Sequence, residues 1–168
     1  LYGDSSNERD LFGFERWLLD RVLHPPMKVL DLGCGCGRVS LAMARHGLRV
    51  IAGDLNPVSV RTLKSRTEAT RTLSCLLLDA RSLPFRDSTC DAVIFAFNGL
   101  DFISPEESRL EAVREMARVV KPDGYIILSS HNPIGALLTL RGIRSLKVWK
   151  WRLRFARNLD FLKPYFRD

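Results

Sequence analysis

The sequence alternates between short apolar runs and segments in which apolar residues recur every three or four positions. Short runs bounded by turn residues are typical of buried strands, and the second spacing is typical of amphipathic helices. The apolar runs predict five strands, at residues 28–32, 48–53, 73–78, 91–95 and 125–129. Because strands that alternate with helices form a parallel sheet covered by helices, we expect an α/β fold, a three-layer α/β/α sandwich.

The first predicted helix spans about residues 10–23, before His24-Pro25-Pro26, where the prolines end it. Its predicted buried face consists of apolar residues three or four positions apart: Leu11, Phe14, Leu18 and Val22, with Trp17 beside them. The second predicted helix spans residues 37–46, and Gly47 is expected to be its left-handed C-terminal residue.

Two further helix starts carry capping signals. Asn56-Pro57 places an N-cap residue before a proline at the first helical position. Ser104-Pro105-Glu106-Glu107 predicts a serine cap with a glutamate that completes a capping box. This last helix is expected to end at residues 121–124, and its predicted buried face consists of Leu110, Val113, Ala117 and Val120.

The first predicted strand runs into a loop with three glycines, Asp31-Leu32-Gly33-Cys34-Gly35-Cys36-Gly37. Glycine is needed where φ is positive or where the backbone approaches a ligand closely. The N–H groups at the start of the following helix attract polar and anionic groups. A dinucleotide fold requires G-x-G-x-x-G, but Arg38 holds the place of the third glycine. A nicotinamide oxidoreductase therefore stays open only as an alternative.

This D-x-G-x-G-x-G pattern resembles the first motif of the class I S-adenosylmethionine-dependent methyltransferases. Residues 79–87, DARSLPFRD, followed by the D-A-V of residues 91–93, resemble the ubiquinone/menaquinone-type branch of that family. Residues 118–128, RVVKPDGYIIL, are similar to the stretch that leads into the family's fifth strand. The resemblance covers about residues 28–130 and implies a Rossmann-like, mostly parallel sheet. It also implies S-adenosylmethionine as the cofactor and S-adenosylhomocysteine as its product.

The family sheet usually ends with an antiparallel hairpin of two further strands. No alternating strand pair is legible after Pro133 in this sequence. We therefore expect that the hairpin lies beyond Asp168 or that this is a shortened member. Because the sequence begins with Leu1 rather than Met, we also expect the chain to start inside a longer gene product or after a disordered start.

Carboxylates at the ends of two predicted strands are expected to bind the nucleoside part of the cofactor. Asp54 lies 17 positions after Gly37, about where nucleotide-binding α/β units place a carboxylate for the ribose hydroxyls. Leu55 offers an apolar surface to adenine. The resemblance implies that Asp79 accepts a hydrogen bond from the adenine amino group and that the N–H of Ala80 binds a ring nitrogen.

In the resembled family, the loop after the fourth strand lines the methionine part of the cofactor and faces the acceptor. Asn98 and Asp101 are its polar residues, and a common family pattern has His near position 101. The complete predicted cofactor site consists of Asp31, Gly33, Gly35, Gly37, Asp54, Leu55, Asp79, Ala80, Phe95 and Asn98.

Catalysis on an activated sulfonium methyl group needs mainly in-line placement of the acceptor and exclusion of water. A general base is needed only if the acceptor must lose a proton. Asp101 and His131, which follows the fifth strand, are the candidates. For His131 a solvated loop histidine is an equal alternative.

The net charge of +7 lies entirely at the C-terminal end. Residues 1–140 contain 17 basic and 17 acidic residues, whereas residues 141–168 contain nine and two. Trp149-Lys150-Trp151-Arg152 suits phosphates with stacked bases or anionic lipid headgroups, although a charge run is by default a solvated face. We divide the chain into a catalytic domain, residues 1–133, and a basic helical tail, residues 134–168, that covers the substrate.

The composition, 46% hydrophobic and 27% charged, predicts a globular protein. No apolar run approaches the roughly 20 residues of a transmembrane segment, and no signal peptide is evident, so we expect a cytoplasmic location. The four cysteines, at positions 34, 36, 75 and 90, lack metal-ligand spacing. We interpret them as buried free thiols and expect no metal.

The sequence thus predicts a methyltransferase that acts on an O, N or C atom of a small-molecule acceptor. The basic tail favours a phosphate- or lipid-bearing acceptor. One alternative is a nucleic-acid-binding methyltransferase that uses the tail, but the neutral body of the chain argues against it. The other is a non-catalytic S-adenosylmethionine-binding module.

Overall fold

The structure is a computed structural model and describes residues 11–67 and 72–130. All of its elements lie in one compact unit that ends at Ser130. The helices are α1 (Gly13–Arg21), α2 (Arg38–Arg45), α3 (Pro57–Thr67), the 3-10 helix η2 (Gly99–Phe102) and α4 (Glu106–Val119). The strands are β1 (Lys28–Leu32), β2 (Arg49–Asp54), β3 (Leu73–Leu77), β4 (Cys90–Phe95) and β5 (Val120–Leu128).

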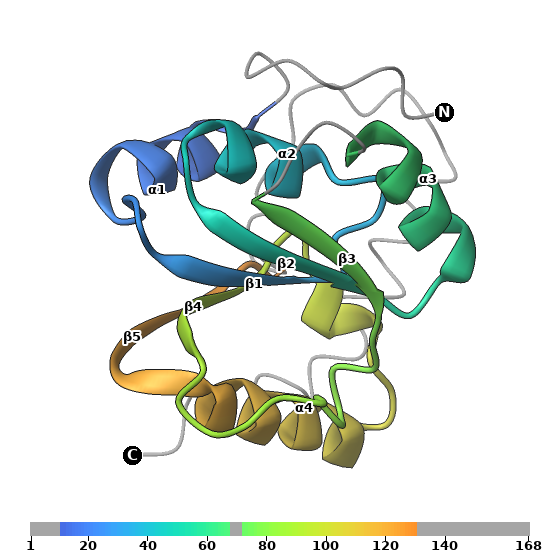
Figure 1. Cartoon of the computed structure of the whole chain (residues 1–168). Coiled ribbons are helices and arrows are strands. Elements are labelled where there is room, and N and C mark those ends of the chain that lie inside the picture. Colours follow the sequence, from blue (N-terminus) through green and yellow to red (C-terminus); the bar gives the residue numbers. More distant parts are fainter. Residues whose placement is uncertain (1–10, 68–71, 131–168) are drawn as a thin grey trace, which may run out of the picture. The chain divides into compact units, whose positions relative to one another are not determined.

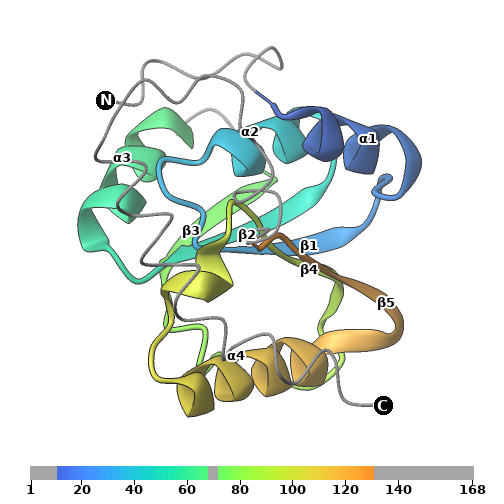
Figure 2. The ribbon, with the colours of Figure 1, turned by 180° about the vertical axis from the view of Figure 1, so that it is seen from behind.

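The five strands form one sheet in the order β3-β2-β1-β4-β5, and every neighbouring pair is parallel. Helices α1, α2 and α3 cover one face of this sheet, and α4 covers the other (Figures 1 and 2). The predicted three-layer α/β architecture with five parallel strands is therefore confirmed.

Strand order reverses between β1 and β4, which are direct neighbours in the sheet. The chain moves outward from β1 to β2 and β3, and then returns to the other side of β1 with β4 and β5. In open α/β sheets, ligands bind outside the carboxyl ends of the strands at such a reversal. The loops after Leu32 and Phe95 meet at this point.

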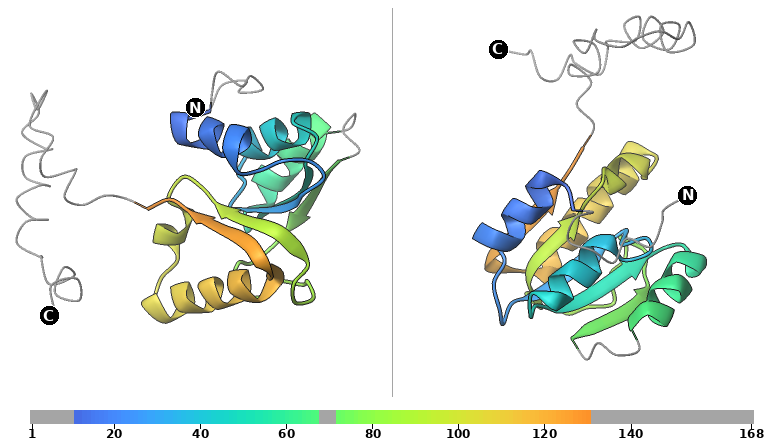
Figure 3. Two further views of the ribbon diagram at one scale, coloured as in Figure 1. Left: turned by 90° about the vertical axis from the view of Figure 1, so that its left-hand side faces the viewer. Right: turned by 90° about the horizontal axis from the view of Figure 1, so that it is seen from above.

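The two central strands form the core. Val29, Leu30, Ala92 and Val93 are fully buried. Strands that are covered on both faces are buried along their length, which explains their near-continuous apolar sequence. One hydrophobic cluster lies beneath α1, α2 and α3, and a second lies beneath α4. Figure 3 shows these helices on the two faces of the sheet from the side and from above.

The edge strands depart from the predicted pattern. β3 was predicted to be a buried strand, but it forms one edge of the sheet, where Leu76 and Leu77 are exposed. β5 begins at Val120, five residues before its predicted start, and its register with β4 shifts between Cys90 and Ala92. Residues 121–124 therefore lie within β5, although the sequence predicted them to be the end of the preceding helix.

The predicted buried face of α1 is wrong at two positions. Phe14 and Trp17 are about half exposed, whereas Glu15 is buried together with Leu18 and Leu19. Glutamate is buried here because Arg38 pairs with it. No apolar periodicity can reveal such a partner.

Helix α4 is turned by about one residue relative to the prediction. Its buried residues are Ser108, Ala112, Met116 and Val119. Leu110 and Ala117 face outward instead. The helix also begins at Glu106, with Pro105 as its N-cap and no side-chain cap, so the predicted Ser104 cap is wrong.

Other helix ends agree with the prediction. Asn56 Oδ1 accepts a hydrogen bond from the Val58 N–H at 2.9 Å, as an N-cap residue does. Gly47 has a φ of +82°, which is the left-handed residue expected after α2. These local signals depend on neighbouring backbone groups alone, so the sequence is sufficient to predict them.

Candidate functional site

The loop between β1 and α2 requires glycine for two physical reasons. Gly33 and Gly37 have φ values of +61° and +87°. A Cβ atom on Gly33 would lie 2.7 Å from Cε2 of Phe95, and one on Gly37 would lie 2.1 Å from Cδ1 of Leu63. Both glycines therefore allow close packing of the loop against the protein itself. Gly35 differs, because a Cβ there would meet no atom within 4 Å.

Asp54, at the end of β2, is bonded to the glycine loop. Its Oδ2 accepts a hydrogen bond from the Gly35 N–H at 2.8 Å, and its Oδ1 accepts one from the Asn56 N–H, also at 2.8 Å. A carboxylate has about four lone-pair positions, so these two bonds leave acceptor capacity on both oxygens. The following residue, Leu55, is 66% exposed. The predicted ribose and adenine contacts are therefore accessible.

Asp31 and Phe95 are buried residues of β1 and β4 next to the glycine loop. Asp31 is 2% exposed, and its Oδ2 accepts a hydrogen bond from the Ser40 hydroxyl at 2.5 Å. Burial raises the pKa of Asp31 to about 7, and the nearby carboxylates of Glu15 and Asp54 add to this effect. Phe95 is also buried. The predicted direct contacts of these two side chains with the cofactor stay predictions.

Asp79 lies just beyond the end of β3, next to the strand that carries Asp54. It forms an ion pair with Arg81, whose Nη2 lies 2.6 Å from Oδ2, and it also accepts a hydrogen bond from the backbone N–H of Arg81. The side-chain contact lowers the pKa of Asp79. The carboxylate predicted to bind adenine therefore already holds a guanidinium of its own chain.

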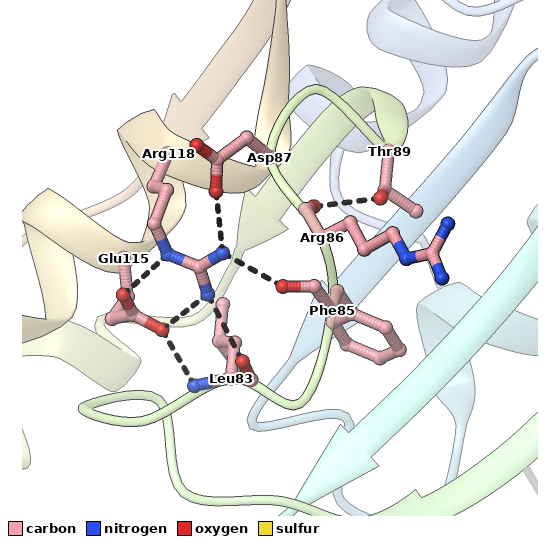
Figure 4. Close-up of polar contacts among 7 residues, drawn as sticks. All are labelled: Leu83, Phe85, Arg86, Asp87, Thr89, Glu115 and Arg118. Atoms are coloured by element: carbon pink, nitrogen blue, oxygen red, sulfur yellow. Dashed lines mark hydrogen bonds and ion pairs between the residues drawn. The ribbon is translucent and has the colours of Figure 1, made fainter.

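The segment from Asp79 to Thr89 joins β3 to β4 without a helix and is held by α4 (Figure 4). Arg118 donates hydrogen bonds to the carbonyl oxygens of Leu83 and Phe85, at 3.0 and 2.7 Å. Glu115 binds both the guanidinium and the Leu83 N–H, the latter at 2.7 Å. Arg118 also pairs with Asp87 at 2.9 Å. The sequence did not reveal this network, because the contacts between the loop and α4 join residues 31 to 35 positions apart.

The loop after β4 is tied to the end of β5. Ser129 Oγ accepts a hydrogen bond from the Asn98 N–H at 2.9 Å. The Ser130 hydroxyl donates to both carboxylate oxygens of Asp101, at 2.9 and 3.1 Å. Asn98 and Phe97 have φ values of +60° and +53°, a rare backbone conformation for residues with a side chain. Asp101 thus lies on the predicted acceptor side, whereas His131 and the tail lie outside the described residues.

A cluster that sequence reasoning missed joins this loop to α1. The carboxylate of Glu15 binds the guanidinium of Arg38 through both oxygens. The guanidinium lies against the ring of Phe12 and near the ring of Phe97. The sequence hinted at this cluster only through Arg38, which stands in the place of the third glycine of a dinucleotide-binding loop.

The cysteines are all free thiols. Cys75 and Cys90 are buried, and burial raises the pKa of each. Cys34 is partly buried with a raised pKa, but Cys36 is exposed, so the expectation that all four are buried is wrong. Within residues 11–67 and 72–130, no three His, Cys, Asp or Glu side chains group in a way that could hold a metal ion.

The carboxyl ends of the parallel strands form one edge of the sheet, which we call the cofactor edge. This edge carries Asp54, Asp79, Asn98 and the three glycines. Among the residues that the structure describes, no helix has the length and apolar character needed to cross a membrane.

Comparison with known proteins decides which nucleotide fold this is. Residues 29–124 match a family model described as a methyltransferase domain. The chain belongs to this methyltransferase family. The matched region includes the glycine loop, Asp54 and Asp79, and the cofactor of such domains is S-adenosylmethionine.

Individual relatives agree with this assignment. The chain is 33% identical over 118 residues to demethylmenaquinone methyltransferase of Renibacterium salmoninarum, which covers 69% of this chain and 47% of that protein. The likeness to the quinone-type branch is thereby confirmed. A crystal structure of an S-adenosylmethionine-dependent methyltransferase from Methanosarcina mazei matches with a TM-score of 0.62 and 26% identity, over 71% of this chain and 57% of that one.

A third relative carries a different name. The chain is 30% identical over 119 residues to carboxy-S-adenosyl-L-methionine synthase of Vibrio parahaemolyticus, which covers 67% of this chain and 47% of that protein. The chain spans less than half the length of both of these relatives.

Proposed function

We propose that the protein transfers the methyl group of S-adenosylmethionine to an O, N or C atom of a small-molecule acceptor. The observation that carries this proposal is the hydrogen bond of 2.8 Å between Gly35 and Asp54. It joins the loop expected to hold the methionine part to the carboxylate expected to hold the ribose.

The residues of the site fit this cofactor. Open space next to Gly35 admits a ligand, and Asp54 retains acceptor positions for hydroxyl groups. Exposed Leu55 offers an apolar surface for a purine. Asp79 and the Ala80 N–H complete the adenine contacts.

The cofactor supplies an activated sulfonium methyl group, so the chain has to position the acceptor and exclude water. The loop of residues 96–102 carries out the first task. Asp101 is the base candidate if the acceptor must lose a proton, and Ser130 holds its carboxylate in place. His131 is the second candidate.

We further propose a phosphate- or lipid-bearing acceptor and a cytoplasmic location. The basic residues of the segment 141–168 support the first point, because the rest of the chain is neutral. The similarity to a demethylmenaquinone methyltransferase supports a small-molecule acceptor, since that relative is named for a small molecule.

Isothermal titration of the full chain with S-adenosylhomocysteine tests the cofactor, with NAD as the comparison. We expect saturable binding of S-adenosylhomocysteine and none of NAD. Turnover is then measured as S-adenosylhomocysteine release, with phosphate-bearing acceptors and their dephosphorylated analogues. Tight RNA or DNA binding that falls steeply with salt would instead favour a nucleic-acid substrate.

One observation favours a second function. The relative named carboxy-S-adenosyl-L-methionine synthase shares 30% identity with the chain, so a domain of this kind is compatible with modification of the cofactor itself. Mass spectrometry of the nucleoside products separates the two. Methyl transfer yields S-adenosylhomocysteine, whereas cofactor modification yields a heavier S-adenosylmethionine derivative, and a non-catalytic module yields neither.

A further inference from the structure

Helix α1 is connected to the cofactor edge of the sheet by four residues, Phe12, Glu15, Arg38 and Phe97, which we call the Arg38 cluster. Arg38 follows the last glycine of the loop, and Phe97 follows β4. The cluster therefore joins three segments that surround the predicted methionine end of the cofactor. A role for the cluster in ligand binding depends on the proposed function of this edge as a cofactor site.

The ion pair in the cluster is built for a single geometry. Nη2 of Arg38 lies 2.7 Å from Oε1 of Glu15, and Nη1 contacts Oε2. The same Oε2 accepts a hydrogen bond from the Phe12 N–H at 2.9 Å. Glu15 is only 6% exposed. A planar guanidinium that binds both oxygens of a buried carboxylate fixes the orientation of both side chains.

The two rings add a second contact to the same guanidinium. Cζ of Arg38 lies 4.7 Å from the ring centre of Phe12 and 5.9 Å from that of Phe97. The rings themselves are nearly parallel, at 6° and 5.8 Å between centres. A guanidinium over an aromatic face is attracted by the ring's electrons. Phe97 adopts its left-handed conformation (φ +53°) where it meets the cluster, as residues at binding sites often do.

A cavity lies beneath α1, lined by Glu15 of the cluster and by Phe14, Leu18, Ile94 and Ile127 among others. The Arg38 cluster concentrates polar and aromatic contacts at the N-terminal end of α1, next to the glycine loop.

We infer that Arg38 is a positioning residue that holds α1 closed over the amino-acid end of the cofactor and so controls how fast the cofactor dissociates. The alternative is that the cluster only stabilises the fold. Two ligands distinguish the positioning role from a purely structural role. S-adenosylhomocysteine has the amino-acid group, and 5′-methylthioadenosine lacks it.

The test uses the full chain and the double variant Glu15→Gln/Arg38→Met, which removes the pair without leaving a buried charge unpaired. Phe12→Leu removes one ring and keeps the ion pair. Arg45→Met is the matched control, because Arg45 is an exposed arginine at the other end of α2. Dissociation rates are measured for both ligands, and hydrogen exchange is measured for the α1 amides.

We expect the double variant to release S-adenosylhomocysteine about tenfold faster, a change of the size expected when one charge-assisted hydrogen bond of the attachment is lost. Phe12→Leu is expected to have a smaller effect in the same direction. The release of 5′-methylthioadenosine stays unchanged, α1 exchanges faster, and Arg45→Met behaves like the wild type. Equal changes for the two ligands, or no change for either, overturn the inference. If the wild type binds neither ligand, the proposed cofactor site itself is wrong.

Discussion

Gly35 donates its backbone N–H to the carboxylate of Asp54 at 2.8 Å, across the carboxyl ends of two neighbouring strands. The bond fixes the carboxylate beside the loop, so that ribose and methionine contacts are organised before a ligand binds. Such preorganisation lowers the entropy that binding must offset.

Asp54→Ala is expected to weaken S-adenosylhomocysteine binding by about 1.5–3 kcal/mol, because hydrogen bonds to a carboxylate are charge-assisted. Isothermal titration measures the loss. Asp123→Ala is the control, since Asp123 is an exposed carboxylate on β5, away from the glycine loop. Unchanged affinity in Asp54→Ala would remove this residue from the site.

Gly35→Ala separates backbone strain from ligand contact. Its Cβ would meet no protein atom within 4 Å, so the substitution costs stability only through the φ of +54°, about 1–2 kcal/mol. Gly47→Ala has a comparable positive φ of +82° outside the site. A Cβ on Gly47 would also lie 3.2 Å from Cγ of Pro25, so we expect Gly47→Ala to lose at least as much stability as Gly35→Ala in urea unfolding. Only Gly35→Ala is expected to lose cofactor affinity. If both bind cofactor normally, the loop does not contact it.

Asp31 makes stability depend on pH. Its pKa in the folded protein is about 7, above the ordinary value of 3.8, so the native state binds an extra proton between these values. The contribution of Asp31 to the free energy of unfolding is therefore fully present below about pH 4. It declines as pH rises towards 7, by at most about 4 kcal/mol. Asp31→Asn removes this contribution. Measured by urea unfolding from pH 4 to 8, the free energy of unfolding should depend less on pH in Asp31→Asn than in the wild type. Identical slopes in both proteins would contradict the raised pKa.

Arg81→Ala is expected to tighten S-adenosylhomocysteine binding severalfold. The guanidinium that holds Asp79 competes with the adenine amino group for the same oxygens. The effect is modest because the pair is partly exposed to solvent. Arg86→Ala, an exposed arginine in the same loop, is the control, and equilibrium titration measures both. Weaker binding in Arg81→Ala would show that the arginine supports the site.

Arg118→Met should lower the melting temperature by several degrees and weaken cofactor binding. The substitution leaves the carbonyls of Leu83 and Phe85 without their guanidinium donor, so the loop that begins at Asp79 loses its support from α4. Arg114→Met, on the exposed side of the same helix, should change neither property. Thermal unfolding and titration are the measurements, and an unaltered affinity in Arg118→Met would uncouple α4 from the site.

The sequence by itself determined the order of the elements and the parallel sheet, and the roles of the predicted site residues stay predictions. Strand β1 has the predicted bounds, Lys28–Leu32, and the glycines have the predicted positive φ values. Such features follow from local steric rules and from the alternation of strands and helices. Neighbouring residues are sufficient to specify them.

Only the tertiary structure decided which faces are buried and which charges meet. Glu15 is buried because Arg38, 23 positions away, supplies the matching guanidinium. Leu76 and Leu77 are exposed because β3 ends the sheet on one side. Helix α4 buries Met116 rather than Ala117 because packing against β4 and β5 sets its rotation. Each outcome depends on partners distant in sequence, and apolar periodicity carries no information about their identity or position.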